Sequence, residues 1–300
     1  MRKLCVRIIL IFASAIFMFI LCNVVYYKCG KPSRLVAYEV YDAIDKAGTN
    51  EGYTKVVLGD SVARQIFDPE YQEENDDICY LATNQAIMTL GNYMLLERFI
   101  ENNSQLEEVY YIARPDSLLG GINFKFTYSY FVTPLYREPF TEYLEPETRE
   151  EIENTFGSFF AKREFPKWLL AKYPKLLEIY QNGCGEMRQL RYSMYGSMNN
   201  ENMSIFYVRK MQELCEENNI ELHLLASPVP ESYQFNSAEI QTILERYYLE
   251  EFYSEYASSI LKIKDEEFVD MVHLNAEFLE EKRLSIWAKL ISRGDIEYER

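Results

Sequence analysis

Three short apolar runs that alternate with helical segments constrain the fold of this chain more than any other feature. The runs cover residues 55–58, 77–81 and 109–113, and the first is rich in β-branched side chains. Helical periodicity follows the first run over residues 61–67 and the second over residues 86–102. Strand–helix–strand units with short links predict a doubly wound parallel sheet, so we expect an α/β fold.

The same alternation returns in the last third of the chain. We expect helices at residues 205–218, 238–256 and 276–293, with strands at residues 220–226 and 259–263. The sequence therefore predicts one α/β domain over residues 51–300, preceded by a stalk at residues 28–50 and interrupted by an insertion at about residues 120–203.

The insertion is crowded with aromatic side chains. They include Phe124, Phe126, Tyr128, Tyr130, Phe131, Tyr136 and Phe140. Aromatic rings dominate core burial, and their faces also stack on sugar rings. The insertion is therefore expected either to pack as additional core or to form the lid or wall of a substrate cleft.

An uncharged, apolar segment lies near the N-terminus at residues 8–27. At a rise of about 1.5 Å per residue, a helix of this length spans roughly 30 Å, the thickness of a bilayer core. Arg2, Lys3 and Arg7 precede it, which favours a cytoplasmic N-terminus. We expect one transmembrane helix that leaves the main domain on the extracytoplasmic side.

A cleaved signal peptide is the alternative for this segment. Its one small-residue triplet of the A-x-A kind, Ala13-Ser14-Ala15, lies inside the apolar run, too early for a cleavage site. Lys28, Lys31 and Arg34 follow the run and weaken the charge bias that sets its orientation.

Charge and cysteine content exclude several classes of function. The formal net charge is −16, and the first 34 residues hold six basic side chains and no acidic one, so the rest of the chain is still more acidic. Such a domain repels phosphate backbones, which excludes nucleic-acid binding. The six cysteines are widely and irregularly spaced, so no metal site is expected.

The residues that carry chemistry lie at the ends of predicted strands. Gly59-Asp60-Ser61 follows the first strand, and Asp270 and His273 follow the last one in the stretch FVDMVHLN. In α/β sheets the ligand crevice lies beyond the carboxyl ends of the strands. The chain has two histidines, and the other, His223, lies within a predicted strand, where we expect it to be packed in the core.

These side chains fit a nucleophile and its base. Asp270 and His273, three residues apart, would share one face of a helical turn, so that the carboxylate orients the imidazole toward Ser61. Gly59 permits a tight turn and a close approach of substrate. Backbone N–H groups at the start of the helix after Ser61 would stabilise an oxyanion. No cofactor is needed for such chemistry.

The stretches VVLGDSVARQIF and FVDMVHLN resemble the SGNH/GDSL hydrolase superfamily, above all its membrane-anchored branch of DltD-like and alginate-acetylation proteins. The resemblance covers roughly residues 53–120 and 205–295. It implies a flavodoxin-like fold with Ser61 as nucleophile, His273 as base and Asp270 as the orienting carboxylate.

The sequence departs from the family pattern at two oxyanion positions. LATNQA stands where the family has a glycine, so Asn84 is the expected substitute. The family's asparagine after the third strand is absent, and Arg114 lies nearby. Arg114 is expected either to lend positive charge to the oxyanion or to pair with Asp116. Arg64, one turn beyond Ser61, is expected to be an exposed or salt-bridged helix residue.

The sequence thus predicts a membrane-anchored serine esterase or O-acyltransferase. The expected substrate is an O-acyl group, above all acetyl, on an envelope or exported polysaccharide, with a membrane-bound acyl-transfer partner as a further expectation. The alternative is a catalytically impaired domain that binds carbohydrate or acts as a scaffold in polysaccharide assembly. A plain cytosolic esterase is disfavoured by the apolar segment at residues 8–27.

Overall fold

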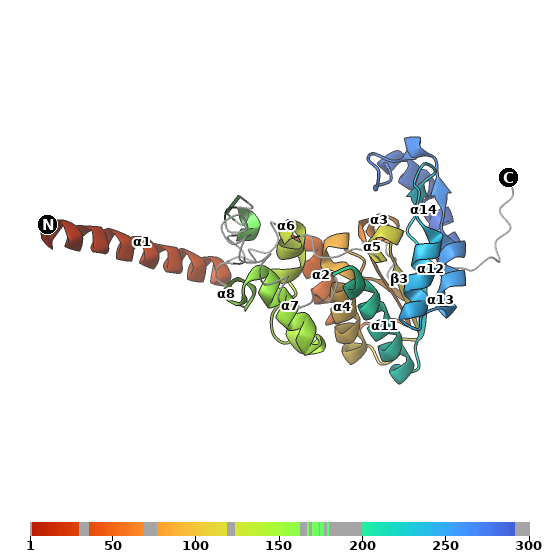
Figure 1. Ribbon diagram of the computed structural model, residues 1–300, viewed down its shortest axis with the longest axis horizontal. Coiled ribbons are helices and arrows are strands. Elements are labelled where there is room, and N and C mark those ends of the chain that lie inside the picture. The colour runs from red at the N-terminus through yellow and green to blue at the C-terminus, as the bar shows by residue number, and fades with distance from the viewer. Residues whose placement is uncertain are drawn as a thin grey trace.

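The computed structural model describes residues 2–29, 36–68, 77–118, 124–162 and 200–291, together with scattered positions between 167 and 179. Within these ranges a parallel sheet is covered by helices, as Figure 1 shows. The prediction of an α/β fold built on a parallel sheet is confirmed.

The main sheet has four parallel strands in the order β2-β1-β3-β4. They are β1 (Lys55–Gly59), β2 (Ile78–Tyr80), β3 (Glu108–Ile112) and β4 (Glu221–Leu225). After β1 the chain adds β2 on one side and β3 on the other, so the strand order reverses between β1 and β3. Such a switch point opens a crevice at the carboxyl ends of the two strands.

Successive strand residues point to opposite faces of the sheet, and both faces are apolar. Val56 and Leu58 belong to one buried cluster, whereas Val57 between them belongs to the other. In β3, Tyr111 and Ile112 are divided in the same way. Burial on both faces explains why these strands appear in the sequence as continuous apolar runs.

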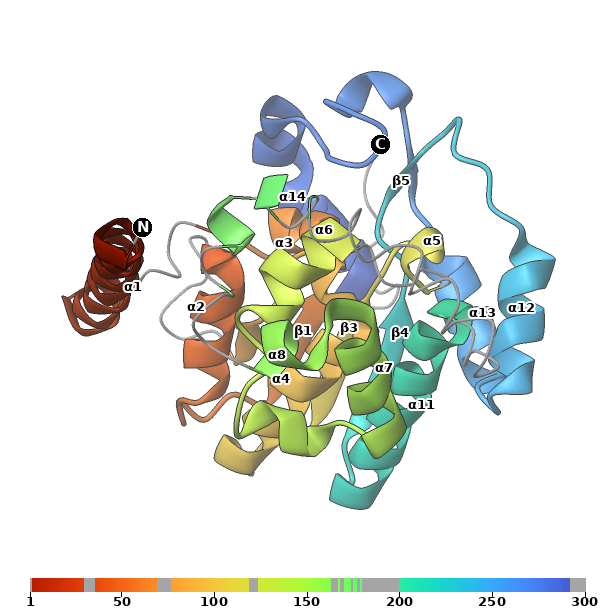
Figure 2. The same cartoon turned by 60° about the vertical axis from the view of Figure 1, so that its left-hand side comes forward.

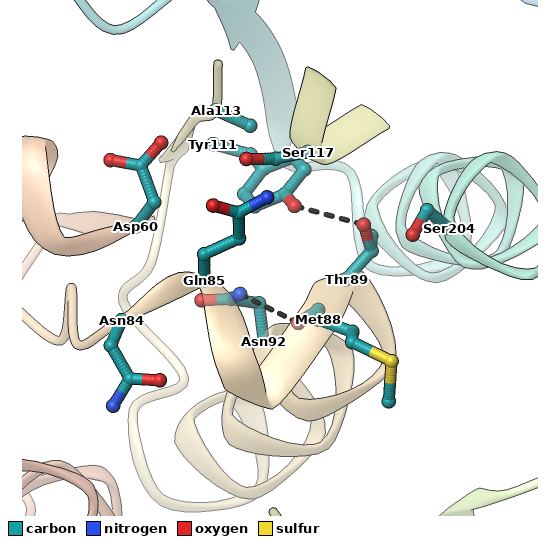
Figure 3. A pocket seen from close by; sticks show the side chains of 10 residues that line it. All are labelled: Asp60, Asn84, Gln85, Met88, Thr89, Asn92, Tyr111, Ala113, Ser117 and Ser204. Atoms are coloured by element: carbon teal, nitrogen blue, oxygen red, sulfur yellow. Dashed lines mark hydrogen bonds between the residues drawn. The ribbon is translucent and has the colours of Figure 1, made fainter. Parts of the chain in front are cut away.

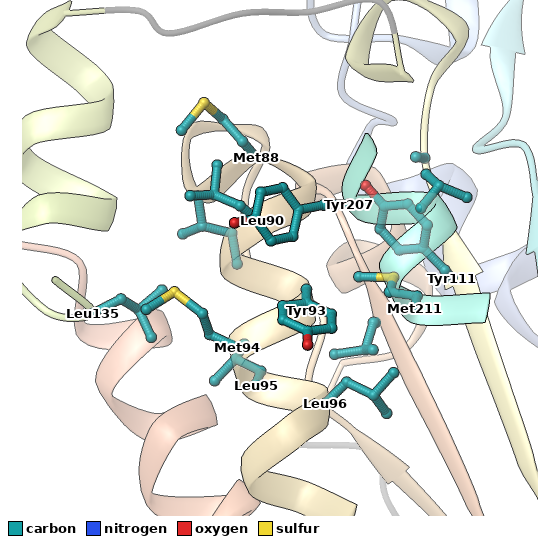
Figure 4. Packing of buried hydrophobic residues seen from close by; sticks show 14 of the residues in the cluster. Met88, Leu90, Tyr93, Met94, Leu95, Leu96, Tyr111, Leu135, Tyr207 and Met211 are labelled. Carbon is teal, nitrogen blue, oxygen red and sulfur yellow. The ribbon is translucent and has the colours of Figure 1, made fainter. Parts of the chain in front are cut away.

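The first face is covered by α2 (Tyr38–Ala47), α4 (Met88–Asn102) and α11 (Asn200–Asn218), and Figure 2 shows α4 and α11 on its near side. Figure 4 shows how α4 fills this space, with Tyr93 turned toward Tyr207 of α11. Their ring centroids lie 5.3 Å apart. The helix α4 is buried almost all round, because it lies between the sheet and its neighbouring helices.

The second face is covered by α3 (Ser61–Ile66) and α14 (Ala276–Ile291). Phe67, just after α3, contacts Tyr80 of β2 and Trp287 of α14, with centroid distances of 5.7 and 6.5 Å. The short helix that begins with Ser61 is therefore fixed between the sheet and the last helix.

The described part of the insertion packs as core. It contains α6 (Phe124–Thr127), η4 (Tyr128–Val132), η5 (Phe140–Tyr143), α7 (Pro146–Phe156) and α8 (Ser158–Lys162), after the short helix α5 (Pro115–Leu118). Tyr128, Phe131, Tyr136 and Phe140 are all buried in the cluster on the first face. For these four residues the structure supports core packing, whereas Phe126 is exposed and Tyr130 is half-buried.

Residues 38–47, expected to be part of a stalk, instead form α2 and belong to the domain. Val40, Ala43, Ile44 and Ala47 lie on one side of this helix and are buried against the first face. The spacing of these four residues is that of an amphipathic helix. The amphipathic pattern distinguishes the segment from a linker.

The helix expected at residues 238–256 is two helices, α12 (Ser237–Arg246) and α13 (Glu251–Ser259). Tyr248 adopts a left-handed conformation with φ 59°, and Leu249 N–H bonds to Leu244 O, which closes α12 as in a Schellman motif. Glycine usually occupies such a position, and its absence hides this break in the sequence.

The strand expected at residues 259–263 is short and lies outside the main sheet. It forms β6 (Lys262–Ile263), which pairs in parallel with β5 (Val229–Pro230). The 3-10 turn η6 (Asp265–Glu267) follows directly and leads into the stretch that carries Asp270 and His273.

The N-terminal segment forms α1 (Arg2–Cys29), a helix that projects from the α/β body in Figure 1. Its described apolar side chains, Ile9 and Phe12 among them, are exposed. Among the residues that were described, no helix qualifies as long and apolar enough to cross a membrane. The anchor at residues 8–27 is therefore not confirmed and stays a prediction.

Gly59 provides a test of the close packing at the end of β1. A Cβ at this position would lie 2.3 Å from Ile112 O and 2.8 Å from Ala63 Cβ. We expect Gly59→Ala to lower the free energy of unfolding by about 3 kcal/mol, because β1 and β3 must move apart. Urea unfolding of the purified chain measures this loss.

Gly52→Ala is the matched control, since Gly52 has φ +76° but no atom within 4 Å of an added Cβ. This variant should lose only the cost of a left-handed alanine, about 1 kcal/mol. Equal losses in the two variants would contradict the steric account of Gly59.

Candidate active site

Ser61 is the first residue of α3 and lies where β1 ends, beside the switch point of the sheet. Asp60 precedes it as the N-cap of α3, and its Oδ1 accepts hydrogen bonds from the N–H groups of Val62 and Ala63, both at 3.0 Å. This cap begins the helix at Ser61 and fixes the direction of its first turn.

The Asp60 carboxylate also joins the ends of three strands. Its Oδ2 accepts from Arg114 N–H after β3 at 3.0 Å, and the Ser227 hydroxyl after β4 lies 3.0 and 2.9 Å from its two oxygens. Asp60 is 4% exposed and Ser227 is fully buried. Burial raises the pKa of the Asp60 carboxyl, and the hydrogen bonds that Ala63, Arg114, Ser227 and Val62 donate act in the opposite direction.

Ser61, His273 and Asp270 form a continuous chain of hydrogen bonds. Ser61 Oγ lies 2.9 Å from His273 Nε2, and His273 Nδ1 lies 2.9 Å from Asp270 Oδ2. With the proton of a neutral imidazole on Nδ1, Nε2 is free to accept from the Ser61 hydroxyl. The structure thus brings together the three side chains that the sequence analysis selected, across 212 positions of the chain.

The expectation of a helical turn at Asp270–His273 is wrong, because these residues lie in a loop. Phe268 and Leu274 form an antiparallel bridge at the base of the loop, and Val269 N–H bonds to His273 O at 2.9 Å. Asp270 Oδ1 accepts from Val272 N–H and His273 N–H, both at 2.7 Å. One carboxylate therefore folds the turn and orients the imidazole.

Gln65 fixes this loop to the helix that carries Ser61. Its Nε2 donates to Leu274 O at 3.2 Å, and its Oε1 accepts from Leu274 N–H at 3.1 Å. Gln65 lies one turn after Ser61 on α3, and Leu274 follows His273 directly. The paired bonds therefore set the register between the hydroxyl and the imidazole.

Arg114 fixes the same loop from its other side. Its guanidinium donates from Nε to Asp116 Oδ1 at 3.0 Å and from Nη1 to Met271 O at 3.2 Å, and it lies 4.9 Å from the centre of the Tyr233 ring. Arg114 is 3% exposed. Of the two expectations for Arg114, pairing with Asp116 matches these contacts, and its charge is directed to the loop.

Asn84 is engaged away from Ser61. It caps the short helix η3 (Gln85–Ile87) by accepting from Ala86 N–H, and its Nδ2 donates to Glu39 Oε1 at 2.9 Å. The expected oxyanion contact of Asn84 has no support in this arrangement. Gly59, in contrast, lies at the tight strand exit where it was expected, and its N–H donates to Asn92 Oδ1.

The Asp60 cap uses backbone N–H groups of the first turn of α3 that would otherwise be free to stabilise an oxyanion. Val62 N–H and Ala63 N–H are both used by Asp60. In the described part of the chain, no acceptor is seen for Ser61 N–H, which therefore remains available to a substrate oxygen. A serine hydrolase needs such donors where the oxyanion develops.

Two other residues named from the sequence lie outside this site. His223 is buried in β4, where Nδ1 lies 3.1 Å from Glu255 Oε1, so its expected place in the core matches the structure. Arg64, expected to be exposed or salt-bridged, is half-buried instead, and its guanidinium lies 5.2 Å from the centre of the Tyr38 ring.

Sequence reasoning named Asp60 only as part of the Gly59-Asp60-Ser61 triplet and missed its role as a cap, and it missed Gln65 and Ser227 altogether. An aspartate directly before a helix is a cap signal, so Asp60 was detectable. Gln65 and Ser227 carry no such signal, since each acts through a partner more than 160 residues away.

Across the described ranges, no group of three or more His, Cys, Asp or Glu side chains is arranged to hold a metal ion. Comparison with known proteins adds no identification, because no family model, curated protein or solved structure matches the chain.

The Asp270 contacts predict a pH dependence of stability. The hydrogen bond to His273, with those from the His273 and Val272 N–H groups, lowers the pKa of Asp270 to about 2 from 3.8. A lowered folded-state pKa adds stability above the unfolded value, and this contribution is lost as the pH falls through about 4 to 2.

Urea unfolding of wild type and Asp270→Asn over a pH series measures this contribution. The difference between them should be constant above about pH 5 and should shrink toward pH 2. A difference that is unchanged across that range would show that the ionised Asp270 carboxylate does not hold the loop.

Proposed function

We propose that the chain is a serine esterase or O-acyltransferase that works by acyl transfer through Ser61. The observation that carries this proposal is the hydrogen-bonded chain from Ser61 through His273 to Asp270, with 2.9 Å at each link. It lies at the carboxyl end of β1, where α/β sheets bind ligands. The nucleophile, base and orienting carboxylate of an acyl-transfer site are all in contact.

In the first half of the proposed reaction, Ser61 Oγ attacks the acyl carbonyl carbon while its proton passes to His273 Nε2. Asp270 stabilises the imidazolium that forms. The tetrahedral oxyanion takes a hydrogen bond from Ser61 N–H. Collapse breaks the ester bond, and the departing sugar hydroxyl takes the proton from His273, which leaves an acyl group on Ser61.

In the second half, a hydroxyl group attacks the acyl-serine carbonyl and gives its proton to His273. When water is the acceptor, the products are a free acid and the restored Ser61. When a sugar hydroxyl is the acceptor, the product is a new ester, and the protein is a transferase. His273 returns the proton to Ser61 Oγ in both cases, so the cycle needs no further group.

The proposal extends to fold family and location. The strand order β2-β1-β3-β4 is that of the first four strands of a flavodoxin-like sheet, which supports the SGNH/GDSL resemblance. The apolar segment at residues 8–27 motivates a membrane anchor, with the catalytic domain outside the cytoplasm. The strong acidity of the domain favours an uncharged or cationic saccharide as substrate.

A second candidate, a carbohydrate-binding or scaffolding subunit, is favoured by one observation. Asn84 and Arg114 are both occupied elsewhere, and the Asp60 cap uses two N–H groups beside Ser61. Losing one oxyanion donor typically lowers the rate by about 10²–10³. With few oxyanion donors the domain would catalyse acyl transfer slowly, which favours a binding or scaffolding role.

Ser61→Ala tests the proposed nucleophile. We expect it to lower kcat/KM for p-nitrophenyl acetate by at least about 10³, because the acyl-enzyme intermediate forms on the Ser61 hydroxyl. Ser258→Ala is the control, since Ser258 is exposed and, among the described residues, its hydroxyl donates to Glu255 O of its own helix. Turnover by Ser61→Ala equal to that of the control would refute the assignment.

Gln65→Met tests the positioning of His273. Methionine keeps the length of the side chain and removes both bonds to Leu274. We expect kcat to fall about 10- to 100-fold with little change in KM, because a small displacement of the imidazole slows proton transfer without weakening substrate binding.

Gln241→Met is the control for Gln65→Met. Gln241 is exposed on α12, and in the part of the chain that the structure describes its side chain donates to Glu245. A decrease in kcat no larger than that of the control, or an increase in KM that accounts for the whole loss, would exclude a positioning role for Gln65.

A further inference from the structure

A small cavity lies beside Asp60, the residue before Ser61, at the carboxyl ends of β1 and β3. Its volume is about 30 Å³, and its walls include Asp60, Ala113, Gln85 and Ser117. In the view of Figure 3 the end of the Gln85 side chain is drawn close to Ser117 and Tyr111, and Asp60 stands to their left. The cavity is at the point where the strand order reverses, which is where α/β sheets take up ligands.

Most polar groups of the cavity wall are satisfied within the protein. Thr89 Oγ1 and Tyr111 Oη lie 2.9 Å apart, and Asn92 Nδ2 donates to Met88 O at 2.9 Å, as the dashed lines in Figure 3 show. Both oxygens of Asp60 accept bonds from backbone N–H groups and from Ser227. These groups shape the wall and leave little capacity for a ligand.

Two polar groups at the cavity differ from the others. Ser117 Oγ is a buried atom that has no hydrogen-bond partner among the residues that the structure describes. Gln85 is exposed, and among the described residues no hydrogen bond of its side-chain amide is found. A buried hydroxyl without a partner costs free energy, so such groups in native proteins usually receive a bond from water or a ligand.

The size of the cavity limits what can enter it. A single water needs about 10–15 Å³ of such space, so about 30 Å³ admits two or three water-sized groups. A carbonyl oxygen and one methyl group meet this limit. A longer acyl chain exceeds this volume, and Met88, which is 9% exposed, is one of the apolar residues that line the cavity.

We propose that this cavity is the acyl pocket of the site and restricts the transferred group to acetyl. Ser117 Oγ and the Gln85 amide donate hydrogen bonds to the acyl oxygen, in the role for which Asn84 and Arg114 are unavailable. Met88 closes the pocket against longer chains. This inference rests on the proposed acyl transfer through Ser61, which directly follows the Asp60 wall of the cavity.

Met88→Ala and Met94→Ala test the pocket as a matched pair. Both methionines belong to α4 and to the same buried cluster, and Figure 4 shows them at different levels of the helix. Met88 lines the cavity and Met94 does not. The readout is kcat/KM of the full chain for p-nitrophenyl acetate, propionate and butyrate.

Wild type should prefer acetate over butyrate by at least about tenfold, since one methylene in a tight pocket changes kcat/KM by roughly 10- to 200-fold. Met88→Ala should raise the butyrate-to-acetate ratio about tenfold, whereas Met94→Ala should leave it unchanged. An equal ratio in both variants and wild type would overturn the pocket, and so would an equal shift in both variants.

Ser117→Ala provides a second measurement that does not depend on a core substitution. It should lower kcat/KM for the acetate ester about tenfold without changing the chain-length preference. Unchanged acetate turnover would show that Ser117 holds only a water. These outcomes differ from failure of the proposed function itself, in which Ser61→Ala and wild type would hydrolyse every ester equally.

Discussion

The structure of the site depends on one buried carboxylate. Asp60 accepts hydrogen bonds from the first turn of α3, from Arg114 N–H after β3 and from the Ser227 hydroxyl after β4. All these partners are donors, and only an acceptor with several lone pairs can satisfy them together. The carboxylate therefore fixes the ends of three strands relative to one another and determines where Ser61, the next residue, begins its helix.

The second half of the site is a loop whose side chains Phe268, Val272 and Leu274 pack against the second face of the sheet. Its turn is folded by Asp270, and it is attached to the α/β body by Gln65 at Leu274 and by Arg114 at Met271. Gln65 is on the same short helix as Ser61, and Arg114 donates its N–H to Asp60. The same rigid framework thus holds the hydroxyl and the imidazole, and such support is what a catalytic contact near 3 Å requires.

Strand positions could be predicted from the sequence because burial on both faces leaves continuous apolar runs, and the meeting of Ser61 with His273 followed from their places at strand ends. The conformation of the loop could not be predicted, because a spacing of three residues from Asp270 to His273 fits both a helical turn and an Asx turn. The pairing of Arg114 with Asp116 was one of two expectations, but the contacts of Asn84 with Glu39 and of Arg114 with Met271 could not be predicted. Their partners, Glu39 and Met271, come from segments whose placement depends on the whole fold.

The proposed chemistry requires Ser61 to be a nucleophile that His273 activates. Labelling of the full chain with a fluorophosphonate, followed by peptide mass spectrometry, examines this requirement, because the reagent reacts with activated serines and needs no knowledge of the substrate. We expect modification confined to Ser61 in wild type and its loss in His273→Ala. Ser61 that stays unmodified, or that reacts equally well without the imidazole, would contradict it.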